Sequence, residues 1–337
     1  MEKLLYYPNI SLPKTPWLFH SLLYWKEIKT ITPTIYFDQP DTLYKNYMRE
    51  LIETGLVTQI HPGEHIDNMS DFRKNFLNYI DNFYMPKIDS YKTYPDGTLK
   101  YSHKIHHEKL NLIGQDFIDR DLAFIKNGWY YTHGSIAKDF MFYLANVLGP
   151  VVNSQPITDN PWHMKTRFNS TSITDSSKTI YKEKLRRIIL NGAFPSPANL
   201  INISELYDFK EKYGDKLHNF RNFIEIKIIE IDNAQDHNRE AMVNNLLKEI
   251  NESKEEIKEA MKSKWKVPNI ENSLLTLSLG GSLYDQINQS EGSILVGSTI
   301  LGLTGAVIGT IRNHKAYKQK KLENPLSYAY LVGTKLK

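Results

Sequence analysis

Histidine and carboxylate side chains gather in a short segment that follows a predicted strand. The segment HPGEHID holds four of them: His61, Glu64, His65 and Asp67. Imidazole and carboxylate groups exchange protons near neutral pH, and loops that follow strands often carry the binding residues of α/β folds. Pro62 and Gly63 separate the two histidines and disfavour a regular helix there. The segment predicts either acid–base catalysis by His61, Glu64 and His65, or a turn that only closes the strand.

A second segment, HKIHHEKL, concentrates potential metal ligands further along the chain. With one residue from GWYYTH, the set is His103, His106, His107, Glu108 and His133. A metal site needs three or four convergent ligands, and these lack a His-x-x-x-His helical repeat, so we expect no metal. His103 and His106 remain candidates for acid–base catalysis, with a solvent-exposed turn as the alternative. Because the two histidine groups are far apart in sequence, we expect that they are not both catalytic.

Other reaction classes lack their motifs. The chain has no cysteine, which excludes disulfides, zinc–thiolate sites and cysteine nucleophiles. The glycine-rich stretches LGGSLYDQ and LGLTG match neither a Walker loop nor the dinucleotide-binding motif, and no Gly-x-Ser-x-Gly elbow occurs. The sequence therefore predicts no bound cofactor.

Residues 292–311 form an uncharged, glycine-rich segment, GSILVGSTILGLTGAVIGTI. As a helix it would be about 30 Å long, which matches the core of a bilayer. Ten of its twenty residues are Gly, Ser or Thr, which weakens partition into lipid. Gly305 and Gly309 form a G-x-x-x-G pair that allows close helix packing. We expect a helix, or a hairpin with residues 273–287, packed within the resting protein, and a membrane span is the alternative.

A basic cluster follows this segment directly: Arg312, Lys315, Lys318, Lys320 and Lys321. Together with Gly305 and Gly309, these residues are the candidate contacts with a protein partner or with anionic lipid. The net charge is +4, yet residues 312–337 alone hold seven Lys or Arg and one Glu, so the rest of the chain is slightly acidic. Nucleic-acid-binding proteins more often spread basic residues over the fold, so the sequence does not support a nucleic-acid partner.

Strand and helix signals alternate in residues 1–66, where they must position the first histidine segment. LLYY, ITPTIYF and LVTQIHP are typical of strands, and TPWLFHSLLYWKEI is typical of a helix with Pro16 at its first position. This order predicts a small α/β layer with parallel strands. Helical patterns dominate residues 68–150, and residues 151–182 are typical of a Ser/Thr-rich linker or loop.

Residues 183–337 are predicted to form a mostly helical domain. KLRRIILNGAFPSP is expected to begin it as a strand, and apolar seams at 217–231 and 243–261 predict two long antiparallel helices. The predicted fold class is therefore α+β or α/β: an N-terminal domain (1–150), a linker (151–182), and a helical domain (183–337) that includes a glycine-rich helical stretch at 273–311.

The stretch LYYPNISLPKTPWLFHSLLYWKEIKTITP resembles the opening of a family of uncharacterised bacterial proteins. Members share a Tyr-Tyr-Pro strand, a helix that ends in Leu-Leu-Tyr-Trp, and an Ile-x-Pro strand. FMFYLANVLG, LYDFKEKYGDKLHNFRNFIE and NPLSYAYLV follow the same pattern, so the resemblance covers most of the chain. It implies a shared fold and a bacterial origin. Because the family has no assigned reaction, it implies no catalytic residues.

These observations predict a bacterial interaction or effector protein, with a role in defence against phage or another stress, whose glycine-rich segment acts at a partner or a membrane. One alternative is a hydrolase that acts on phosphodiesters through the histidines of 61–67 or 103–108. Another is a structural subunit of a complex. The N-terminal residues contain no apolar run of signal-peptide length, so we expect a cytoplasmic protein, peripheral to the inner face of the membrane where it meets one.

Overall fold

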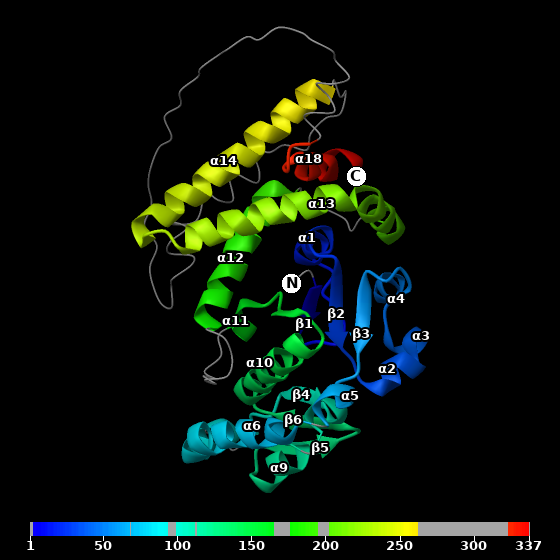
Figure 1. The fold of residues 1–337 in the computed structure, drawn as a ribbon. Helices are drawn as coiled ribbons and strands as arrows, with labels where there is room; N and C mark the ends of the chain where they lie inside the picture. Colours follow the sequence, from blue (N-terminus) through cyan, green and yellow to red (C-terminus); the bar gives the residue numbers. More distant parts are fainter. Residues whose placement is uncertain are drawn as a thin grey trace. The chain divides into compact units, whose positions relative to one another are not determined.

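The computed structural model describes residues 3–67, 69–93, 99–111, 113–164, 176–194, 202–261 and 323–336. The chain divides into two compact units, Met1–Thr174 and Asp175–Lys337, each described here by itself (Figure 1). The stretch predicted as a linker, 151–182, contains regular structure: strand β7 (Gln155–Ile157) joins the sheet of the first unit, and helix α12 (Ser176–Ala193) begins the second. The Ser/Thr-rich residues 165–175 lie outside the described residues.

The first unit is built on a four-stranded parallel sheet, which confirms the predicted α/β layer. The strands are β1 (Lys3–Tyr6), β2 (Glu27–Ile31), β3 (Val57–Ile60) and β7, and their order is β3-β2-β1-β7. The chain runs from β1 outward to β2 and β3, and later returns to the other side of β1. The direction of winding therefore changes between β1 and β7.

Helices cover both faces of this sheet, as the side chains at the end of β1 show. The ring of Tyr6 lies 5.5 Å from that of Trp17 in helix α1 (Pro16–Tyr24). The preceding residue of the strand, Leu5, belongs to one buried cluster with Phe140 and Leu144 of helix α10 (Gly134–Val151). Successive side chains of a strand point to opposite faces, so α1 and α10 cover opposite faces of the sheet. The arrangement is that of a doubly wound α/β layer.

The second strand lies earlier in the chain than the sequence pattern predicts. ITPTIYF contains only the last residue of β2; the strand ends at Ile31, and helix α2 (Thr34–Asp38) begins after Pro33. Proline has no N–H for a strand ladder and its fixed φ suits a helix start, which explains the change of structure. Two further helices complete the crossover to β3: α3 (Pro40–Leu43) and α4 (Asn46–Glu53).

A mixed segment lies between β3 and α10. Its helices are α5 (Gly63–Ile66), α6 (Ser70–Phe83), η1 (Met85–Lys87), α7 (Ile88–Lys92), α8 (His107–Leu110) and α9 (Ile113–Asp119). Its strands, β4 (His103–His106), β5 (Ala123–Lys126) and β6 (Trp129–Thr132), form an antiparallel sheet in the order β4-β6-β5. Asn127 and Gly128, both with positive φ, form the two-residue turn between β5 and β6.

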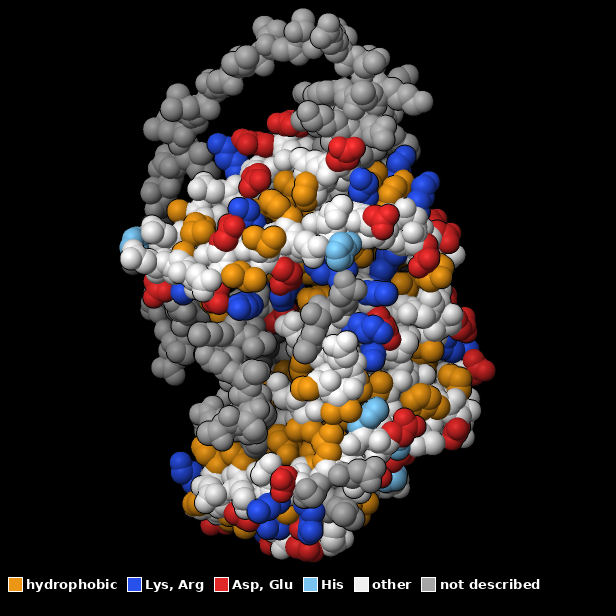
Figure 2. Space-filling view, viewed as in Figure 1, with side chains coloured by type: hydrophobic (Ala, Val, Ile, Leu, Met, Phe, Trp, Pro, Cys, Tyr) orange, Lys and Arg blue, Asp and Glu red, His pale blue; other side chains and the backbone are white. Residues whose placement is uncertain are grey.

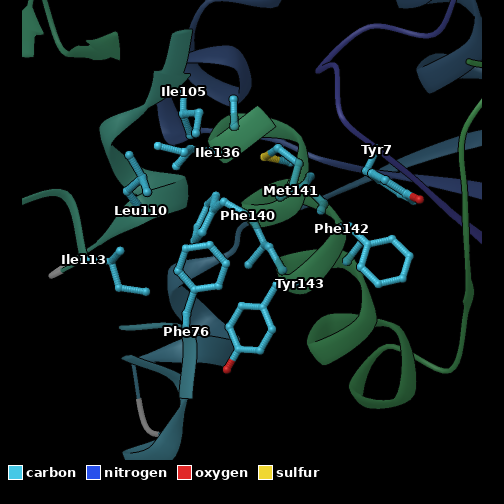
Figure 3. Close-up of a cluster of buried hydrophobic side chains, with 14 of the residues drawn as sticks. Tyr7, Phe76, Ile105, Leu110, Ile113, Ile136, Phe140, Met141, Phe142 and Tyr143 are labelled. Atoms are coloured by element: carbon cyan, nitrogen blue, oxygen red, sulfur yellow. The ribbon is translucent and has the colours of Figure 1, made fainter. Parts of the chain in front are cut away.

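An aromatic core joins this segment to α10 (Figure 3). The fully buried ring of Phe76, on α6, lies 5.2 Å from Phe140 and 5.2 Å from Tyr143, both on α10. The Tyr143 hydroxyl donates to the carbonyl oxygen of Phe72 at 2.9 Å. This packing fixes α10, whose first turns carry residues of the candidate site.

Within its described residues the second unit consists of helices, which confirms the prediction of a mostly helical C-terminal part. They are α12, α13 (Ile203–Asp232), α14 (Asp236–Met261) and α18 (Ser327–Lys335). The long helices α13 and α14 are antiparallel, and Figure 2 shows acidic and basic side chains interspersed over their surface. The first predicted seam is buried throughout: Leu217, Phe220, Ile224, Ile228 and Ile231.

The strand predicted in KLRRIILNGAFPSP is instead part of helix α12. A short apolar run has no decisive period, but Leu185, Ile189 and Ala193 are fully buried at a spacing of four, which is helical. Tyr328 of α18 is also fully buried, with its ring 5.6 Å from Phe209.

The glycine-rich stretch 273–311 and its basic cluster lie outside the described residues. This includes Gly305, Gly309 and the five cations between Arg312 and Lys321. Among the helices within the described ranges, none combines the length and the apolar character that crossing a membrane requires.

Candidate functional site

A pocket of about 620 Å³ lies just beyond the carboxyl end of β1. Residues 8–12, which follow β1, form one wall, and Ala137, Lys138 and Met141 of α10 form another. His163 of helix α11 (Pro161–Met164), soon after β7, also lines it. In doubly wound sheets, ligands bind beyond the carboxyl ends of the strands, where the winding direction changes. The pocket occupies that position, between the segments that follow β1 and β7.

The lining of the pocket is rich in basic side chains. Among the described residues it includes four lysines and three histidines but no aspartate or glutamate: Lys45, Lys104, Lys109, Lys138, His103, His106 and His163. Lys104 lies over the ring of Trp129 at 4.4 Å, and Lys138 lies 3.7 Å from Asp139. Glu108 and Asp159 also lie near the lining, beside His106 and His163. Four lysines still give the lining an excess of positive charge, which attracts anions.

Two of the pocket histidines are neutral at pH 7. Burial, reinforced by the neighbouring His107, lowers the pKa of His106 to about 4, and burial lowers that of His163 to about 4 as well. Nδ1 of His106 accepts the backbone N–H of Glu108 at 3.4 Å, which assigns the ring proton to Nε2. A neutral imidazole can accept a proton on its unprotonated nitrogen, but that nitrogen of His106 already accepts the Glu108 N–H, so His163 is the ring that can act as a general base.

Glu108 brings the two predicted histidine segments together. Its Oε2 atom lies 2.8 Å from Nε2 of His61, and it accepts the backbone N–H and the hydroxyl of Thr34 at 2.7 and 2.8 Å. Burial alone would raise the pKa of Glu108, but the hydrogen bonds from Thr34 and His61 outweigh it and lower that pKa below its ordinary value. Glu108 is therefore ionised at neutral pH and positions its three donors.

Of the other candidate residues predicted from the sequence, one lines the pocket and the rest lie outside its lining. His103 lines the pocket, with Nδ1 3.1 Å from the hydroxyl of Ser102, whereas His133 caps α10 by accepting the backbone N–H of Ser135. Glu64 is exposed, His65 is half-buried, and within the described ranges neither side chain forms a hydrogen bond or an ion pair. Asp67 accepts a hydrogen bond from the side chain of Asn111. The structure thus places His103 and His106 in the pocket and leaves Glu64 and His65 outside its lining.

His106, His107 and Glu108 offer donor atoms within 4.8 Å of one another. Nδ1 of His106 and Nε2 of His107 each lie 3.9 Å from Oε1 of Glu108. The other carboxylate oxygen already accepts from Thr34 and lies against His61, and Nδ1 of His106 already accepts a backbone N–H. Since two of the three side chains are engaged in protein contacts, we assign no metal site to them.

Lys109, Lys138 and His163 were not singled out from the sequence. Lys109 is 3% exposed, and its ammonium donates to the carbonyl oxygen of Pro8 at 3.4 Å. Burial lowers its pKa to about 7. A lysine in the polar stretch HKIHHEKL resembles a surface residue, so no local signal marks it as buried.

Comparison of the chain with protein-family models, with curated proteins and with solved structures finds no match. The resemblance of the N-terminal motif to uncharacterised bacterial proteins stays a prediction.

Proposed function

We propose that the first unit binds an anionic small molecule, one that carries a phosphate or carboxylate group, in the pocket beside β1. The observation that supports this proposal is the composition of the lining: seven basic side chains and no carboxylate among its described residues. An anion in such a pocket lowers the repulsion between the cations around it. The apolar side chains of Ile105 and Met141, which also line the pocket, suit the organic part of the ligand.

A second candidate function, hydrolysis of the bound compound, extends the alternative predicted from the sequence. One observation favours it: the imidazole of His163 lines the pocket and, with a pKa of about 4, is neutral at pH 7. A neutral imidazole can accept a proton from an attacking water, and nearby lysines can stabilise charge that develops on a phosphoryl group.

Calorimetric titration of the full chain tests the binding proposal. ATP, pyrophosphate and succinate are the anionic probes, and adenosine is the uncharged control. We expect binding of at least one anion, weakening with added salt, and no comparable binding of adenosine. Lys104→Gln, which changes an exposed pocket lysine, should weaken binding several-fold. Lys126→Gln, at an exposed lysine outside the pocket lining, should not. Absence of anion binding, or equal binding of adenosine, would contradict the proposal.

The interaction or effector role, including phage defence, and the role as a structural subunit stay predictions of the sequence. The first depends on the glycine-rich segment and its basic cluster, which lie outside the described part of the chain. The pocket proposal concerns the first unit alone and can be tested independently.

A further inference from the structure

Lys109 is a buried cationic group at the wall of the pocket. Its side chain is 3% exposed, yet it lines the pocket. An ammonium has three N–H donors, and the described residues provide this one with a single acceptor, the carbonyl oxygen of Pro8. The distance of 3.4 Å is long for a hydrogen bond to an amine. The amine therefore retains donors for a further partner.

The acidic groups near this wall, which include Asp159 beyond β7, accept hydrogen bonds from residues other than Lys109. Glu108, the next residue in the chain, accepts from Thr34, and its Oε2 lies 2.8 Å from His61. Asp139 of α10 accepts the hydroxyl of Tyr84 at 2.7 Å. The titratable groups that line the pocket with Lys109 are all basic or phenolic: Tyr36, Tyr47, His103, His106, His163, Lys45, Lys104 and Lys138. Among the described residues, Lys109 has no carboxylate as its counter-ion.

A buried ammonium without a counter-ion is unfavourable, because it gives up hydration and gains no opposite charge. An anionic ligand would supply that charge and would favour the protonated amine. The carbonyl oxygen of Pro8 lies beside the amine and is a hydrogen-bond acceptor. A ligand oxygen placed next to it must therefore carry a proton, because two acceptors without a proton between them repel each other. A phosphate that keeps one proton can donate to the Pro8 oxygen and accept from Lys109 at once. A carboxylate at neutral pH has only acceptor oxygens.

We infer that the pocket takes a phosphate monoester, whose phosphate group is bound by the amine of Lys109 beside the carbonyl oxygen of Pro8. This inference rests on the proposed function and narrows it from anions in general to one chemical class. The inference also predicts that protons are taken up when the ligand binds. Because burial lowers the pKa of Lys109 to about 7, the free amine is mostly uncharged at about pH 8. A free phosphate monoester, whose second pKa is about 6, is a dianion at that pH. The complex therefore holds about two protons more than its separated components, one on the amine and one on the phosphate.

Isothermal titration calorimetry of the full chain tests the inference with phenyl phosphate and with benzoate, which share one ring and differ in the acidic group. Titrations at about pH 8 in two buffers of different ionisation enthalpy report the number of protons taken up. We expect wild-type protein to bind phenyl phosphate at least about tenfold more tightly than benzoate, since a hydrogen bond between charged groups contributes that much. Binding should be accompanied by uptake of close to two protons, one by the amine and one by the phosphate.

Two lysine variants test whether Lys109 is responsible for the affinity and the proton uptake. Lys109→Met keeps the length of the side chain and removes the amine, so it should lose about tenfold or more in affinity for phenyl phosphate, together with the proton that the amine takes up. Lys126→Met, at an exposed lysine of β5 outside the pocket lining, should match wild type in both. Circular dichroism of both variants checks that the fold is retained.

Each contrary result has a distinct meaning. Failure of wild-type protein to bind either compound or the anions tested above overturns both the proposed function and the inference. Equal binding of benzoate and phenyl phosphate overturns the assignment of a phosphate monoester. Uptake of one proton or none on binding of phenyl phosphate, or unchanged binding by Lys109→Met, overturns the role of Lys109 beside Pro8 and leaves the anion pocket standing. The wild-type readouts decide the matter even where Lys109→Met fails to fold.

Discussion

Nε2 of His61 lies 2.8 Å from Oε2 of Glu108, although 47 residues separate them in sequence. The same oxygen accepts the backbone N–H of Thr34, which begins α2 just after β2. His61 directly follows β3, and Glu108 lies in α8 directly after β4. One carboxylate therefore connects the inserted antiparallel sheet to the ends of two adjacent strands of the parallel sheet.

Replacement of Glu108 by alanine should destabilise this connection. Three donors lose their acceptor, in a site where the carboxylate is only 20% exposed. We expect the free energy of unfolding to fall by about 1–3 kcal/mol, measured by urea denaturation. Glu64→Ala, at an exposed carboxylate without a described side-chain contact, is the control and should change it by less than about 0.5 kcal/mol. Equal effects of the two substitutions would show that the connection contributes nothing.

Lys109 should make the stability of the protein depend on pH. Its pKa falls from 10.5 to about 7 on folding, so between these values the unfolded chain binds more protons than the folded one. The contribution of Lys109 to stability therefore rises as the pH increases from about 7 to 10, and it is least favourable below about 7. Lys109→Met lacks this dependence. Urea denaturation at several pH values should show wild type gaining stability relative to the variant over that window, and a constant difference would contradict the burial argument.

Metal analysis of the purified protein should find less than one zinc or manganese ion per chain. The physical reason is that Glu108 already accepts hydrogen bonds from Thr34, and Nδ1 of His106 accepts a backbone N–H. A stoichiometric metal that is lost in both His106→Ala and Glu108→Ala would show instead that these contacts rearrange around an ion.

Phe76 should be one of the most important residues for the stability of the first unit. It is fully buried and contacts two aromatic rings of α10 (Figure 3). Phe76→Ala should lower the free energy of unfolding by about 3–5 kcal/mol, because it opens a cavity that neighbours cannot fill. Phe37→Ala removes the same group where it is 41% exposed, and should cost less than about 1 kcal/mol. Chemical denaturation of both variants makes the comparison.

The elements that the sequence predicted well are those whose periodicity is long or repeated. The seam from Leu217 to Ile231 extends over several helical turns, and burial of each member confirms it. Strand β7 could not be predicted in this way. It is three residues long, contains Pro156, and is held by pairing with β1 rather than by any pattern of its own. A proline is tolerated there because β7 is an edge strand.

The site was predictable only in part, for a related reason. Histidine is rare enough for a cluster to attract notice, and two of the predicted residues, His103 and His106, do line the pocket. The importance of Lys109 comes from its burial against Pro8, which is 101 residues away in the chain. Such a long-range contact cannot be predicted from local sequence. The concentration of basic residues in the pocket therefore becomes apparent only in the folded structure.

The pairing of β1 with β7 also bears on the order of events during synthesis of the chain. Tyr6 at the end of β1 and Asp159 beyond β7 are joined by a hydrogen bond of 2.8 Å across 153 residues. At ordinary rates of translation the ribosome needs on the order of ten seconds to cover that distance. Until then one edge of β1 has no strand to pair with, and nascent chains are open to association through it. The lining of the pocket includes His163, which is made later still, so a molecule bound there could stabilise the first unit only once nearly all of that unit has been synthesised.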